Sequence, residues 1–82
     1  MANMQEYYLK NFRLDVQSSY EVSHLVTEIR EAIHNKDQFS MGFNLYQIDL
    51  IDGKVTISSG FIEVEIILSY EEFFHEMSKP VI

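Results

Sequence analysis

The sequence QIDLIDGKVTIS at residues 47–58 predicts a β-hairpin, because it consists of two β-prone runs joined by Asp52-Gly53. A two-residue type I′ turn needs positive φ at both central positions, and Asp-Gly is one of the dipeptides that tolerate this. With Asp52 and Gly53 as the loop, Ile51 faces Lys54 across a hairpin. In that register one face is apolar and the other polar; the apolar face holds Ile48, Leu50, Val55 and Ile57, and the polar face holds Gln47, Asp49, Thr56 and Ser58. The turn and the alternation therefore predict the same hairpin.

A third strand is predicted at residues 61–68, after a reversal at Ser59-Gly60. Its side chains alternate between the two faces of the sheet. The inward set is Ile62, Val64, Ile66 and Leu68, and the outward set is Phe61, Glu63, Glu65 and Ile67. The three strands are expected to form an antiparallel meander, preceded by a loop at residues 37–42.

Two helices are predicted, each from a capping box. Ser18 and Glu21 open a helix at about residues 19–35, whose apolar stripe is Val22, Leu25, Val26, Ile29 and Ile33. Ser69 and Glu72 open a shorter helix that ends before Pro80 and packs on the sheet. Its packing residues are Phe73, Phe74 and Met77.

Residues 9–16 are predicted to form an N-terminal strand, because Phe12, Leu14 and Val16 alternate with Arg13 and Asp15. The expected fold is therefore a single α+β domain over residues 1–82 in the order β-α-β-β-β-α. It combines the three-strand antiparallel meander and the N-terminal strand with one long and one short helix. The pairing of the N-terminal strand stays open.

The charge is concentrated in the second half of the chain. Residues 37–78 contain eight acids and one base, Lys54, whereas the first 36 residues contain five acids and four bases, and the net charge of the 82 residues is −7. Direct nucleic-acid binding and anionic membranes are disfavoured, because both require basic residues. With no cysteine, disulfides and thiolate metal sites are excluded. An apolar fraction of 46% argues against disorder.

The expected location is the cytoplasm. Met1 to Tyr8 lack the basic and apolar regions of a signal peptide. The longest uninterrupted apolar run, Ile66 to Leu68, is far shorter than the roughly 20 residues of a membrane span.

No catalytic residue, cofactor or metal site is predicted. His24 with Glu28, and His75 with Glu71 and Glu72, each offer part of a metal site, but no spacing supplies the remaining ligands. Exposed histidines beside helical carboxylates are common. Glu63 and Glu65 share a strand face, yet an open face lacks the cleft that paired catalytic carboxylates need.

The outer face of the predicted sheet is the candidate interface. It carries apolar residues among acids, which is more than a solvated face needs. The apolar set is Leu45, Ile51, Phe61 and Ile67, and the acids are Asp49, Glu63 and Glu65. Three explanations stay open. The N-terminal strand, the N-terminal tail or the Val81-Ile82 end covers this face, a second copy binds it, or a foreign partner binds it.

The functional expectation is a non-enzymatic binding protein that blocks a basic partner, such as a nuclease or another nucleic-acid enzyme. Six carboxylates would meet lysine and arginine of that partner, as a DNA mimic does; they are Asp49, Glu63, Glu65, Glu71, Glu72 and Glu76. The size, the acidity and the mixture of helix and strand are similar in type to small phage-encoded inhibitors, antitoxins and immunity proteins. The alternative is a homodimeric adaptor whose acidity serves only solubility. The five tyrosines are either interface anchors or boundary residues with a wet hydroxyl.

Overall fold

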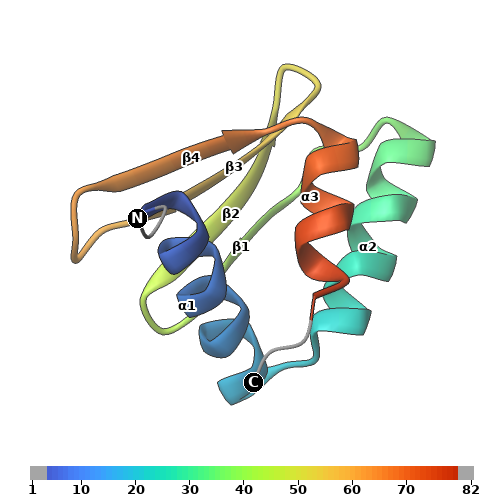
Figure 1. Ribbon diagram of the computed structural model, residues 1–82. Helices are drawn as coiled ribbons and strands as arrows, with labels where there is room; N and C mark the ends of the chain where they lie inside the picture. Colours follow the sequence, from blue (N-terminus) through green and yellow to red (C-terminus); the bar gives the residue numbers. More distant parts are fainter. Residues whose placement is uncertain (1–3, 80–82) are drawn as a thin grey trace.

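The computed structural model describes residues 4–79 and has two layers, a four-stranded antiparallel sheet and three helices that lie on one of its faces (Figure 1). Each strand pairs with its neighbours in the chain, so the sheet order is β1-β2-β3-β4. The elements in chain order are α1 (Met4–Ser19), α2 (Val22–Asn35), β1 (Ser40–Gly42), β2 (Tyr46–Ile51), β3 (Lys54–Ser59), β4 (Val64–Leu68) and α3 (Tyr70–Met77). The α+β class and the antiparallel meander are confirmed.

The order α-α-β-β-β-β-α differs from the predicted β-α-β-β-β-α, because residues 9–16 belong to helix α1 and not to a strand. Leu9, Phe12 and Val16 are buried at spacings of three and four, as on one side of a helix. Leu14, which strand alternation would bury, is 45% exposed. An apolar pattern over eight residues fits both periods, and the prediction of a strand at this place is wrong.

Helix α2 begins later than predicted, and Ser18 does not cap it. Ser18 lies in the last turn of α1, where its hydroxyl donates to the carbonyl oxygen of Asp15 at 2.6 Å. The N-cap of α2 is Glu21, which makes no side-chain capping hydrogen bond. The apolar stripe is nevertheless as predicted, with Leu25 and Ile29 fully buried.

The hairpin of β2 and β3 has the predicted register, with Ile51 opposite Lys54. Asp52 and Gly53 have φ angles of 51° and 75°, which are the left-handed values that a type I′ turn requires. Of the inward side chains, Ile48, Val55 and Ile57 are fully buried and Leu50 is partly buried.

The neighbouring segments differ from the prediction in two places. Residues 40–42 form strand β1 and not a loop, and they pair with β2. Strand β4 begins at Val64, because residues 60–63 form a turn. The hydroxyl of Ser59 accepts hydrogen bonds from the amides of Phe61 and Ile62 at 3.1 and 3.4 Å, which holds this turn. Ile62 is consequently exposed, and its predicted inward position is wrong.

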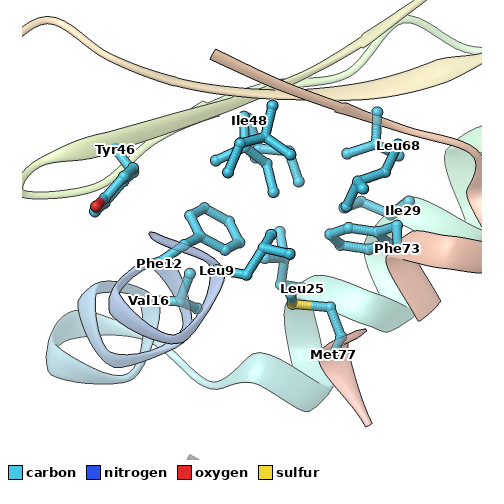
Figure 2. Close-up of a cluster of buried hydrophobic side chains, with 13 residues drawn as sticks. Leu9, Phe12, Val16, Leu25, Ile29, Tyr46, Ile48, Leu68, Phe73 and Met77 are labelled. Carbon is cyan, nitrogen blue, oxygen red and sulfur yellow. The ribbon is translucent and has the colours of Figure 1, made fainter. Parts of the chain in front are cut away.

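The core lies between the sheet and the three helices, and Figure 2 shows side chains of both layers meeting there. Every helix contributes to it. Its members are Leu9, Phe12, Val16, Leu25, Ile29, Tyr46, Ile48, Val55, Ile57, Ile66, Leu68, Phe73 and Met77.

The capping box predicted for the short helix is present at the start of α3. The Ser69 hydroxyl accepts from the Glu72 amide at 3.1 Å, and the Glu72 carboxylate accepts from the Ser69 amide at 2.9 Å. These hydrogen bonds lower the pKa of Glu72 below its ordinary value of 4.5. The charged carboxylate is therefore the form that stabilises the helix.

The first prediction concerns Glu72→Gln, which keeps an acceptor for the Ser69 amide and removes the charge. A lowered pKa stabilises the fold above the unfolded-state pKa, and this contribution disappears as the pH falls through the lowered value. The difference in free energy of unfolding between wild type and variant should therefore be larger at neutral pH than in acid, as measured by urea unfolding. Glu71→Gln removes the same charge without touching the cap and should change less with pH. A Glu72→Gln difference that is independent of pH contradicts the prediction.

Candidate protein-binding surface

The outer face of the sheet lies opposite the helices (Figure 1). Most strand side chains on this face are polar. Thr56 of β3 pairs with Asp49 of β2 on one side and with Ile67 of β4 on the other, so these three residues form one row across the sheet. Ile51 lies in the adjacent row, beside Lys54. Ile51 and Ile67 are 50% and 55% exposed and do not adjoin within a row. These strands therefore present two separated apolar side chains among polar ones.

Leu45 and Phe61, the other two predicted apolar contacts, lie outside the strands. Leu45 precedes β2, and Phe61 lies in the turn between β3 and β4. The Ser59 hydroxyl donates to the Leu45 carbonyl oxygen at 2.6 Å and accepts from the Phe61 amide, so both are held at the same end of the sheet. Ile51 is at the opposite end of β2, roughly 20 Å from Leu45 at about 3.3 Å per residue. The four predicted residues do not form one group.

The covering of the outer face by an N-terminal strand is wrong. Residues 9–16 lie in α1, which packs on the inner face. Phe61 is 77% exposed. The N-terminal tail before residue 4 and the Val81-Ile82 end fall outside the described residues.

The predicted acids fall into two sets on the two layers. Asp49 and Glu65 project from the outer face of the sheet, and Glu63 lies in the turn before β4. The others, Glu71, Glu72 and Glu76, belong to α3 in the helical layer. The structure therefore does not bring the six carboxylates together on one surface.

Two of the three acids on α3 have structural partners. Glu72 caps the helix. Glu76 pairs with Lys79 at 3.0 Å and with the buried Arg13 at 3.6 Å, and Arg13 also donates to the Glu76 carbonyl oxygen at 3.3 Å. These contacts tie α1 to α3 and leave less charge for a partner.

A groove of about 670 Å³ lies between α1 and the segments that enter and leave the hairpin. We call it the tyrosine groove; its lining residues are Tyr7, Tyr8, Asn11, Leu14, Asp15, Ser18, Asn44, Leu45, Tyr46 and Ile62. Four of these are among the eight large apolar side chains that are exposed in residues 4–79, namely Tyr7, Leu14, Leu45 and Ile62. Phe61 adjoins Ile62 in the chain. The exposed apolar surface is therefore concentrated at this end of the molecule.

The wall of the tyrosine groove is built on Asp15 of α1. One carboxylate oxygen of Asp15 accepts the amides of both Leu45 and Tyr46, each at 2.9 Å. Beside it, the Asn44 side chain donates to the Ser18 hydroxyl at 2.7 Å. Asp15 is buried, so this carboxylate joins the helix to the start of β2 and is not a solvated surface charge.

Tyrosine supplies most of the aromatic surface of the groove. The rings of Tyr7 and Tyr8 meet edge to face at 5.4 Å. Tyr46 is buried against Phe12, with its hydroxyl pointing away from the core (Figure 2). Burial raises the pKa of Tyr46, and the nearby Tyr8 and Asp15 raise it further. Its hydroxyl therefore keeps its proton at neutral pH and remains a hydrogen-bond donor.

This groove was not predicted, because residues 9–16 were expected to form a strand. A helical signal was present, since Tyr7, Asn11, Leu14 and Ser18 are spaced by four, three and four residues. Such a spacing places them on one side of a helix.

The two histidine–carboxylate pairs that the sequence offers as parts of metal sites gain no further ligands in the described residues. Within residues 4–79, no group of three or more His, Cys, Asp and Glu side chains is arranged to hold a metal ion. His24 lies 3.6 Å from Glu21, and Glu28 accepts from the Tyr20 hydroxyl, which raises the pKa of Tyr20. No helix in the described part of the chain is long and apolar enough to cross a membrane.

Comparison of the chain with models of known families, with curated proteins and with solved structures found no significant match.

Proposed function

We propose that this chain is a protein-binding domain without catalytic activity, and that it holds a basic partner at the tyrosine groove. The observation that carries the proposal is the gathering of exposed apolar side chains around one groove. Contiguous exposed apolar surface marks interaction sites, and tyrosine is enriched among the residues that dominate binding energy. The groove also offers polar groups, such as Asn11 and Asn44, that can fix the orientation of a bound segment.

The charge supports a basic partner. Glu63 follows Ile62 at the rim of the groove, Glu65 lies further along β4, and the whole chain carries −7. Such a field speeds association with a positively charged surface and disfavours acidic partners. The proposed target is a nuclease or another nucleic-acid enzyme, as for small inhibitors, antitoxins and immunity proteins. Close mimicry of DNA has less support, because the carboxylates are divided between two layers.

The groove also favours a second candidate, a homodimeric adaptor. Phe61 is the most exposed large apolar side chain of the described residues and lies beside the groove. A second copy could place this ring in the groove of the first. Sedimentation of the protein alone distinguishes the two candidates, because only the adaptor is a dimer that Leu45→Asn dissociates.

The second prediction tests the groove by capture of partners from a lysate of the source organism. Leu45→Asn should weaken retention of the partner about tenfold, since truncation of a central contact typically costs more than 1 kcal/mol. Ile51→Asn is the matched control, because Leu45 and Ile51 are 51% and 50% exposed and lie at opposite ends of β2. Equal retention by both variants and the wild type contradicts the role of the groove.

The charge is tested in the same assay by Glu63→Lys with Glu65→Lys. This double variant should lose the basic proteins that wild type retains at low salt and releases at high salt. A double variant of equal charge in the helical layer, Glu71→Lys on α3 with Glu31→Lys on α2, should retain them. Retention that is independent of salt contradicts the basic partner.

A further inference from the structure

Strand β4 forms an edge of the sheet. It pairs with β3 on one side, and no strand of the described residues pairs with its other side. The free backbone groups of an edge strand are a template for another extended chain. Which groups are free follows from the hairpin.

In a two-residue hairpin the residues that flank the loop, Ile51 and Lys54, direct their amide and carbonyl groups at each other. This direction alternates along each strand, so Leu50 points the other way. Its amide does donate away from β3, to the carbonyl oxygen of Phe39 at 3.0 Å. On β3, the same alternation directs the backbone groups of Val55 and Ile57 toward β4.

Val55 and Ile57 face Leu68 and Ile66 across the β3–β4 ladder. Leu68 and Ile66 therefore direct their backbone groups inward to β3. The amide and carbonyl groups of Glu65 and Ile67 consequently point to the free edge. The side chains of these two residues project from the outer face, where both are exposed.

The acidic side chains at this edge favour a basic segment as the added strand. Glu65 is the second residue of β4, and Glu63 precedes the strand. Neither glutamate takes part in an ion pair of residues 4–79, and Lys54 is the only base on the outer face of the strands. A second copy would place its own acidic β4 against this edge: in one register Glu65 faces Glu65, which is destabilising, and in the next it faces Ile67 and gains no opposite charge. A basic segment instead places a favourable opposite charge across from Glu65.

We propose that the edge of β4 binds an extended basic segment of a protein partner as an additional antiparallel strand. The proposal rests on the proposed function, and it names the chemistry of the partner. Arginine or lysine of the added strand lies opposite Glu65, on the outer face of the sheet. Main-chain hydrogen bonds to Glu65 and Ile67 supply affinity, and alternate side chains supply specificity.

The test uses a short synthetic peptide that alternates Arg and Val. In a hydrogen-bonded antiparallel pair the two side chains share a face, so an arginine opposite Glu65 must direct its own amide at β4. N-methylation of the arginine amides should therefore weaken binding about tenfold or more. N-methylation of the valine amides, which point away from β4, should leave binding nearly unchanged. Both modified peptides keep the same charges and side chains.

Variants of the protein provide the second arm. Glu65→Lys should weaken binding of the unmodified peptide about tenfold, because a repulsion replaces an attraction. Glu71→Lys, an equal charge change on α3, should leave the affinity within about twofold. Ile67→Pro should fold but lose binding, because it removes an amide that points to the free edge. On binding, hydrogen exchange at the amides of Glu65 and Ile67 should slow in the wild type.

Three results overturn the proposal. Equal binding of the two N-methylated peptides means that charge alone attracts them. Protection of the Glu65 and Ile67 amides in the protein without peptide means that a second copy covers the edge. Absence of binding by every peptide, while Leu45→Asn still loses the captured partner, rejects the edge and leaves the groove and the proposed function standing.

Discussion

Phe12→Ala is expected to lower the free energy of unfolding by about 3–5 kcal/mol, whereas Leu14→Ala should lower it by less than about 1 kcal/mol. Phe12 is fully buried in the core, while Leu14, two residues later, is 45% exposed at the tyrosine groove. Urea unfolding followed by circular dichroism measures both values. A chain of 82 residues has a stability of roughly 4–12 kcal/mol, so Phe12→Ala removes a large share of it.

The comparison also tests the structure of residues 9–16. If this segment were a strand, Phe12, Leu14 and Val16 would share one buried face. Phe12→Ala and Leu14→Ala would then both lower the free energy of unfolding strongly. Should Phe12→Ala fail to fold, Phe12→Leu provides a milder change, with an expected loss of about 1.5 kcal/mol or less. A Leu14→Ala loss as large as that of the Phe12 variant contradicts the helix.

The parts of the fold that were predicted correctly depend on local chemistry. The Asp52-Gly53 turn and the capping box of Ser69 and Glu72 are each determined by residues within a few positions of one another. The alternation in residues 47–58 then fixes the register of the hairpin without reference to the rest of the chain.

The first helix was missed because its buried charges have distant partners. Arg13 and Asp15 suggested the solvent face of a strand, yet both are buried. Arg13 meets Glu76, which is 63 residues away, and Asp15 accepts amides 30 and 31 residues away. A buried charge is stable only where such partners exist, and no local pattern reveals them.

Some residues of the candidate site were likewise predicted from the sequence, and others depend on tertiary packing. Leu45 and Phe61 were selected as apolar residues of an interface, and the structure exposes both at one end of the sheet. Their neighbours Tyr7 and Leu14 come from α1; Leu14 was predicted to lie in a strand, and no element was predicted at Tyr7. The position of a groove between a helix and a hairpin depends on how they pack, and this is a property of the tertiary structure.

Asp15→Ala is expected to lower the free energy of unfolding by about 2–4 kcal/mol, because two amides lose a charged acceptor and that of Tyr46 is buried. Asp15→Asn keeps one acceptor oxygen and should lose less. Hydrogen exchange at the Leu45 and Tyr46 amides should accelerate in both variants. Asp49→Ala is the control, since it removes the same charge from the outer face and should change stability by about 0.5 kcal/mol or less.

The same carboxylate links stability to the proposed binding. Asp15 fixes the backbone of Leu45, and the side chain of Leu45 forms a wall of the tyrosine groove. Asp15→Asn should therefore fold and still weaken retention of the partner. The segment at Leu45 is then less ordered in the free protein, and ordering it on binding costs free energy. Asp49→Ala should bind the partner more tightly than Asp15→Asn does, although both remove one charge. If the two variants bind alike, Asp15 contributes to stability alone. Its hydrogen bonds to the Leu45 and Tyr46 amides are then not needed for binding at the groove.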